Sequence, residues 1–239
     1  FGRDYGIANI NGKPTRNDVF NILDMAWEKG INRFDTAPGY GSESLLGEFI
    51  TTNGLEDQVK VFTKIPSLKS QVDYEATIKT IIKSSLNNLG CSISILFFHN
   101  PLDSIWLMKN PQFFENLLHD YPISSLGVSV YEPQDVGKLS SCPFDLAFQF
   151  PFNVLDRGFE NMKMPKGKRY ARSIFLQGLL ASADELRPDS PKELLTLQKI
   201  YHEKLAENDL DSICVAVSFA AQNDAIDFFL IGVDSVQQL

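Results

Sequence analysis

The chain has 239 residues, of which 44% are hydrophobic and 22% charged, enough for one large core or two small ones. Its 30 acidic and 22 basic residues give a net charge of -8, which argues against nucleic acid or an anionic membrane surface as the main partner. No apolar run approaches the roughly 20 residues of a membrane helix. Three widely spaced cysteines indicate reduced thiols in a cytoplasmic protein.

The first half of the chain alternates between helix and strand patterns. Thr15 and Asp18 are spaced as a helix-capping pair, and apolar residues then recur at helical spacing from Val19 to Trp27, up to Gly30. The predicted elements that follow are a strand at 31–36, a helix at 42–50 capped by Ser42, a strand at 59–64, a helix at 73–89 and a strand at 93–98.

The second half continues the alternation with one exception. The predicted elements are a helix at 104–119, a strand at 124–130, a helix at 134–139, strands at 145–150 and 170–175, helices at 191–206 and 211–222, and a strand at 227–232. The tract 157–172 has a weak helical pattern and little room for a full crossover helix. Strands separated by helices imply a parallel sheet with right-handed crossovers.

Two α/β folds compete for these seven predicted strands. One is an open, doubly wound sheet, and the other is an eight-stranded (β/α)8 barrel of the TIM type that lacks one strand in this chain. A dinucleotide-binding open sheet begins with a strand, a G-x-G-x-x-G turn and a helix, and this sequence has no such motif. The length also suits a barrel of roughly 250 residues. We therefore expect a single barrel domain over residues 1–239.

Polar residues follow three consecutive predicted strands. Asp35 ends the first, with Tyr40 in the next loop; Lys64 ends the second and His99 the third. Chemistry in an α/β barrel lies at the carboxyl ends of the strands, and neighbouring strands are about 4.8 Å apart, so the four side chains can meet. Each one alone also has an ordinary explanation, as a turn cap, a loop aromatic, a solvated strand end or a core histidine.

Together the four side chains suit proton transfer to a carbonyl oxygen. A tyrosine hydroxyl ordinarily titrates near pH 10, and a neighbouring lysine ammonium favours its phenolate form. Asp35 can hold Lys64 in place, so Tyr40 can exchange a proton near neutral pH. His99 can donate a hydrogen bond to a developing oxyanion. These groups are suited to reducing a carbonyl, or oxidising an alcohol, with a nicotinamide as hydride carrier.

The stretch "GINRFDTAPGYGSESLLGE", followed by "VFTKIP" and "LFFHNP" in this order and spacing, resembles the signature of the aldo-keto reductases, including a bacterial subgroup. The resemblance covers nearly the whole chain. It implies a TIM-type barrel, an NAD(P)H-dependent oxidoreductase and a catalytic tetrad of Asp35, Tyr40, Lys64 and His99. It also implies that the first strand of the barrel precedes Phe1 and that the last helix follows Leu239.

The resemblance extends to the cofactor site. "LGVSVY" keeps the serine that holds the nicotinamide carboxamide, at Ser129, but has Val130 in place of an asparagine. "ARSIFLQGLL" has Arg172 where an aromatic residue often stacks on the nicotinamide, and a guanidinium can also stack on a ring or pair with phosphate. The implied cofactor contacts are Ser129, Gln149, Arg172, Ser173, Leu176, Gly178, Gly232, Asp234 and Gln238.

The choice between NADP(H) and NAD(H) stays open. The family often uses NADPH, but residues 232–238 contain no lysine or arginine, and Asp234 would repel a 2′-phosphate. The expected substrate is a small carbonyl compound. The stretch "GRDYGIANINGKP" resembles a bacterial subgroup of the family with members that act on sugars, which implies a sugar or sugar derivative. Tyr5 and Trp106 either line the pocket or are plain packing. No metal-ligand spacing appears, and a monomer or weak oligomer is expected.

Two other functions compete with the reductase. The changes at Val130 and Arg172 are compatible with a regulatory protein that binds a nucleotide on the same barrel with little turnover. A weaker alternative is a lyase or epimerase that uses Lys64 as a base or as a Schiff-base amine.

Overall fold

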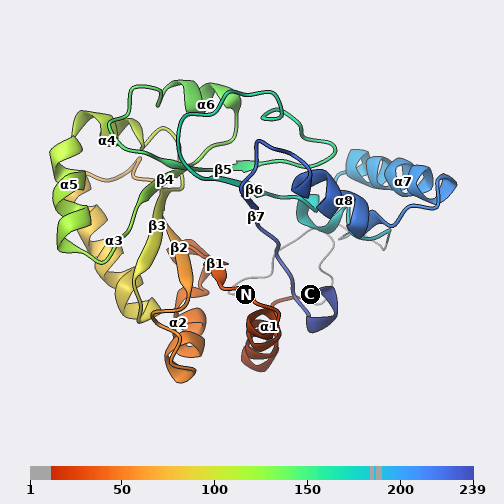
Figure 1. Ribbon diagram of the computed structural model, residues 1–239, viewed down its shortest axis with the longest axis horizontal. Helices are drawn as coiled ribbons and strands as arrows, with labels where there is room; N and C mark the ends of the chain where they lie inside the picture. The colour runs from red at the N-terminus through yellow and green to blue at the C-terminus, as the bar shows by residue number, and fades with distance from the viewer. Residues whose placement is uncertain (1–11, 184–185, 187–189) are drawn as a thin grey trace.

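The computed structural model describes residues 12–183, 186 and 190–239, so Tyr5 lies outside the described residues. Within them the strands form one parallel sheet in the order β1 to β7, which curls as in a barrel (Figure 1). The strands are β1 (Arg33–Asp35), β2 (Lys60–Ile65), β3 (Ile93–Phe98), β4 (Leu126–Ser129), β5 (Ala147–Pro151), β6 (Arg169–Arg172) and β7 (Phe228–Phe229).

The helices that connect these strands cover the outer face of the curl in the first half of the chain (Figure 1). They are α1 (Arg16–Glu28), η1 (Pro38–Tyr40), α2 (Glu43–Thr52), α3 (Tyr74–Leu89), α4 (Ile105–Lys109), α5 (Pro111–Asp120), α6 (Pro133–Gly137), η2 (Leu176–Gly178), α7 (Lys192–Glu207), α8 (Ser212–Ala221) and η3 (Val236–Gln238). No helix connects β5 to β6, as the weak pattern of that tract predicts.

Local signals set the ends of the first helices. The Thr15 hydroxyl accepts from the backbone N–H of Asp18, and the Asp18 carboxylate accepts from the backbone N–H of Thr15, so the predicted capping pair is confirmed. Ser42 does not cap α2, contrary to the prediction. Its hydroxyl lies 2.8 Å from that of Thr36 instead, and this bond ties the start of α2 to the end of β1.

Two predicted elements end earlier than expected. The single helix expected at 104–119 is two helices, because Pro111 disfavours helical geometry at Asn110, where φ is -133° and ψ is 52°. The strand expected at 170–175 ends at Arg172. Ser173 has a φ of 59°, which turns the backbone out of the extended conformation that a strand needs.

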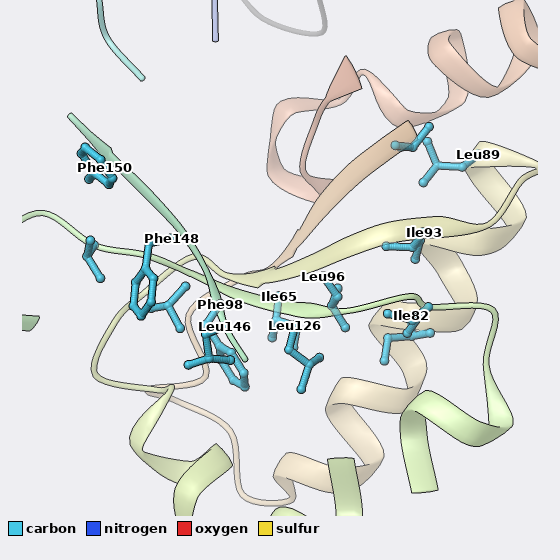
Figure 2. Packing of buried hydrophobic residues seen from close by; sticks show 14 of the residues in the cluster. Ile65, Ile82, Leu89, Ile93, Leu96, Phe98, Leu126, Leu146, Phe148 and Phe150 are labelled. Atoms are coloured by element: carbon cyan, nitrogen blue, oxygen red, sulfur yellow. The ribbon is translucent and has the colours of Figure 1, made fainter. Parts of the chain in front are cut away.

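The main core lies between the outer face of the sheet and the helices. Figure 2 shows Ile82 of α3 and Leu89 at its end beside Ile93, Leu96 and Leu126 of the adjoining strands, all buried. A second, smaller cluster fills the inside of the curl. Its members are Phe62, Ile95, Phe97, Ala147 and Tyr170, with Phe228 and Leu230 packed against them. Burial on both faces explains why β2 and β3 are nearly continuous apolar runs.

The two edges of the sheet face each other without pairing in the described residues. The Arg33 guanidinium of β1 lies 4.6 Å from the ring centroid of Phe228 in β7, across the gap in the curl. The sheet is therefore a curled parallel α/β sheet of the barrel type, and the alternative of an open, doubly wound sheet is wrong.

Candidate active site

The side chains of the site lie on the inner face of the curled sheet, in alternate positions along the strands. Side chains on one face of a strand recur at every second position. Phe62, Phe97 and Tyr170 pack on one another inside the curl, with ring centroids 5.1 to 6.3 Å apart. The residues two positions further along these strands, on the same face, are Lys64, His99 and Arg172. The inner hydrophobic cluster thus gives way to charged and polar groups at the carboxyl ends of the strands.

The strands β4 and β5 also carry a polar residue two positions after a residue of the inner face. Gln149 follows Ala147, a member of the inner cluster. Ser129 follows Gly127, where a Cβ atom would stand 2.6 Å from the Phe97 ring, so the inner packing leaves no room for a side chain at Gly127. Ser129 and Gln149 are both 1% exposed.

Lys64 is held by β1. Its ammonium lies 2.6 Å from Asp35 Oδ2 and 2.9 Å from the carbonyl oxygen of Thr36, and the residue is 1% exposed. The other carboxylate oxygen of Asp35 accepts from Gln149 Nε2 at 2.8 Å. The Asp35 carboxylate therefore has two donors, one from β2 and one from β5, which fix its orientation.

Tyr40 reaches the same place from the loop after β1. Pro38 begins the 3-10 turn η1, and Gly41 ends it with a φ of 70°, a conformation that favours glycine. The turn places the Tyr40 ring with its centroid 4.9 Å from the Lys64 ammonium. The His99 ring stands edge-on to the Tyr40 ring at 6.0 Å between centroids. The structure thus brings Asp35, Tyr40, Lys64 and His99 together.

Burial is the largest cause of the lowered pKa values of Lys64 and His99. Burial lowers the pKa of Lys64, and the Arg172 charge lowers it further, while the adjacent Asp35 carboxylate opposes both effects. Burial also lowers the pKa of His99 below its usual value of 6.5, and the charges of Lys64 and Arg172 add to that effect. The imidazole is consequently neutral at pH 7 and keeps one N–H to donate.

The other predicted cofactor residues lie in two segments. Ser173 and Leu176 have φ values of 59° and 45°, and Gly178 of 100°, in the turn that follows β6. Asn153 holds this turn by donating to the carbonyl oxygen of Ser173 at 3.0 Å. Positive φ in non-glycine residues is strained and is found often at ligand sites. This strain could not be predicted from the sequence, because Ser173 and Leu176 are neither glycine nor asparagine.

The second segment follows β7. Gln238 accepts from the backbone N–H of Asp234 at 2.9 Å, so these two residues form one turn, while Gly232 is exposed before it. Val130 cannot replace the asparagine of the family, because its side chain is fully buried in the outer core.

Two further residues at the site were missed by the sequence reasoning. Tyr131, which is 51% exposed, lies under the Arg172 guanidinium at 4.6 Å from its ring centroid. The Thr36 carbonyl oxygen is a second acceptor for Lys64. A backbone acceptor leaves no signal in a sequence. Trp106, by contrast, packs on Phe113 and Phe114 in the outer layer, which favours the packing explanation for it.

Some kinds of site are not seen in the part of the chain that the structure describes. In that part, no three metal-ligating side chains stand close enough to hold an ion, and no helix is long and apolar enough to cross a bilayer. The three cysteines are unpaired thiols.

A curled parallel sheet with these four side chains at the carboxyl ends of its strands defines the α/β-barrel class. The pattern of the "Aldo/keto reductase family" matches residues 4–239, so the chain belongs to that family. The structure resembles that of a glycerol dehydrogenase from Gluconobacter oxydans with a TM-score of 0.69 and 17% identity, covering 99% of this chain and 88% of that one. At this identity the likeness supports the fold alone.

Two curated bacterial relatives illustrate the family. An aldo-keto reductase of Bacillus subtilis is 25% identical over 193 residues, which are 71% of this chain and 58% of the relative. A D-threo-aldose 1-dehydrogenase of a Pseudomonas species is 30% identical over 129 residues, which are 41% of this chain and 39% of the relative. The chain thus spans about half the length of the curated relatives that it matches.

Proposed function

We propose that the chain is a single barrel domain over residues 1–239 that reduces an aldehyde or ketone to an alcohol, with NADPH or NADH as hydride donor and Tyr40 as proton donor. The observation that carries the proposal is the position of Lys64. Its buried ammonium is bound to Asp35 at 2.6 Å and lies 4.9 Å from the centroid of the Tyr40 ring. Family membership and the tetrad geometry both support this chemistry.

Each side chain of the tetrad has one role in the proposed reaction. A nicotinamide, when bound, would supply the hydride for the carbonyl carbon. As the bond to that carbon forms, the π electron pair moves to the carbonyl oxygen, which takes the proton of the Tyr40 hydroxyl. The remaining phenolate is stabilised by the Lys64 ammonium, and Asp35 keeps that ammonium in place. The neutral imidazole of His99 donates a hydrogen bond to the carbonyl oxygen and orients it.

The described residues fit a nicotinamide nucleotide by their chemistry. The Ser129 hydroxyl and the Gln149 amide can bond a carboxamide, and both are buried where the strands end. The Arg172 guanidinium can stack or bind an anion. We assign the strained turn with Ser173, Leu176 and Gly178 to the nucleotide as well.

We also propose that the turn with Gly232, Asp234 and Gln238 holds the adenosine end of the cofactor. Residues 232–239 bring no cation to it, and Asp234 would repel a 2′-phosphate. Titration of tryptophan fluorescence with NADPH and NADH tests the preference. Tighter binding of NADH is expected if Asp234 decides it, and Asp234→Ser would then raise the affinity for NADPH.

The proposed substrate is a small carbonyl compound, and the name of one curated relative suggests its class. One relative is named for an aldose. We therefore propose a sugar-type carbonyl, handled in the cytoplasm by a monomer or weak oligomer.

Substitution of Tyr40 tests the proposed reaction. Tyr40→Phe is expected to keep the nucleotide affinity and to lower turnover by about 100-fold or more, because it removes the proton donor and nothing else. Tyr121→Phe is the matched control, since Tyr121 ends α5 away from the tetrad, and it should leave turnover unchanged. Full turnover of Tyr40→Phe would exclude Tyr40 as the donor. Nucleotide binding without turnover of any carbonyl by the unaltered protein would favour the nucleotide-binding alternative.

A further inference from the structure

Arg172 carries a positive charge that the site does not neutralise. Its guanidinium reaches Ser173 Oγ and the Val130 carbonyl oxygen only at 3.5 Å, and it lies over the Tyr131 ring. No carboxylate among the described residues forms an ion pair with it. Arg169, on the opposite face of the same strand, differs in this respect because it binds Asp227 at 3.0 Å.

Arg172 faces the place where the tetrad is assembled. Tyr170, two positions earlier in β6, packs inside the curl against Phe62 and Phe97, so Arg172 continues on that inner face. Its charge is one of the causes that lower the pKa of Lys64 and of His99, which places the guanidinium within electrostatic reach of both.

The charges of the site do not cancel. The Lys64 ammonium is paired with the Asp35 carboxylate and His99 is neutral, so among the described residues Arg172 leaves one net positive charge beside the tetrad. The whole chain carries a net charge of -8, which makes a local positive site a specific feature. A planar guanidinium held against an aromatic ring is suited to bind a carboxylate with two parallel hydrogen bonds.

We propose that Arg172, supported by Tyr131, binds a carboxylate on the substrate, so that the preferred substrates are carbonyl compounds that also carry a carboxylate group. The inference rests on the proposed reductase function and narrows its substrate class. It assigns the guanidinium to the substrate, where the family resemblance alone would give it to the cofactor.

The first test measures binding and needs no turnover. Calorimetric titration with benzoate and with benzamide, an uncharged analogue of the same shape, should show tighter binding of benzoate to the unaltered protein, with and without NADP+. Arg172→Gln should remove this preference, which means that the ratio of the dissociation constants for benzamide and benzoate should fall by about tenfold or more. Arg172→Lys should keep part of it. Arg169→Gln, which changes the same side chain on the other face of β6, should leave it intact.

The second test measures turnover of matched aldehydes. Arg172→Gln should lower kcat/KM for 4-carboxybenzaldehyde about tenfold or more beyond any loss that it causes for 4-nitrobenzaldehyde, so the ratio of the two values is the measured quantity. Equal binding of benzoate and benzamide to the unaltered protein would overturn the inference. So would an Arg172→Gln protein that loses nucleotide affinity but keeps the benzoate preference, because the guanidinium would then serve the nucleotide. If neither aldehyde reacts, the proposed reduction fails for these substrates, and the benzoate preference still decides the role of Arg172.

Discussion

Apart from the edge strand β1, which has no buried residue, the first half of the sheet is packed more tightly than its last strand. All the residues of β2 after Lys60 are buried, as are all four of β4, whereas both residues of β7 are only half-buried. The helices follow the same trend. α3 buries Ile78, Ile82, Ser85 and Leu89, whereas the 16 residues of α7 bury only Gln198 and Leu205. Apolar side chains such as Ile200 and Ile213 remain exposed on the second half.

This difference separates the two parts of the proposed site. In the tetrad, Lys64 and His99 stand on β2 and directly after β3, which are buried on both faces, whereas Asp35 of β1 and Tyr40 in the following loop are half-buried. The segments assigned to the nucleotide follow β6 and β7, where less apolar surface is buried. Regions with few buried contacts open locally at a lower free energy than the global unfolding. Lys64 is therefore fixed by the core and holds Asp35 through their ion pair, whereas the cofactor segments depend on local turns.

The largest expected effect is a difference in the free energy of unfolding between two core substitutions, one in each half of the sheet. Phe98→Ala removes a fully buried ring that packs on Phe114, and should lower the free energy of unfolding by about 3–5 kcal/mol. Phe229→Ala removes the same atoms from a half-buried position in β7 and should cost about 2 kcal/mol or less. Urea unfolding of both variants measures the difference, and equal losses would mean that the halves are equally packed.

Removal of the buried cation tests how firmly the tetrad is held. Lys64→Met keeps the volume but leaves the Asp35 carboxylate without its ion partner, so the free energy of unfolding should fall by about 3 kcal/mol. The double variant with Asp35→Asn should recover part of this loss, because neither charge then remains. A double variant less stable than Lys64→Met alone would show that the pair is not coupled in this way.

A smaller effect is expected at the contact between β6 and β7. Hydrogen bonds from Arg169 hold the pKa of Asp227 below its usual range, so the contact stabilises the fold above pH 4 and is lost as the pH falls through the folded pKa. Asp227→Asn should cost about 1 kcal/mol at pH 7. Unfolding curves of the variant and the parent should converge in acid. Asp57→Asn, an exposed control, should follow the parent at every pH, and a constant loss for Asp227→Asn would refute the linkage.

Local patterns were sufficient for most of the fold. The apolar runs at 59–64 and 93–98 predicted β2 and β3 within one residue, because burial on both faces leaves a continuous signal. The predictions failed where one residue changed the local backbone. Pro111 split a helix, Ser173 ended a strand early, and Ser42 bonded Thr36 instead of capping α2. The break at Pro111 is a local effect, whereas the Ser42 bond depends on where the end of β1 places Thr36, and the turn at Ser173 is held by Asn153, twenty positions away.

The sequence by itself determined the parallel α/β order of the elements and placed Asp35, Tyr40, Lys64 and His99 at strand ends, because hydrophobic periodicity and turn chemistry act over short distances. Only the tertiary structure decided which polar groups pair. It bound Gln149 to Asp35 across 114 positions and set Arg172 over Tyr131, without a carboxylate partner among the described residues. Pairing of this kind follows from the register of the strands and the curl of the sheet, which no local pattern contains.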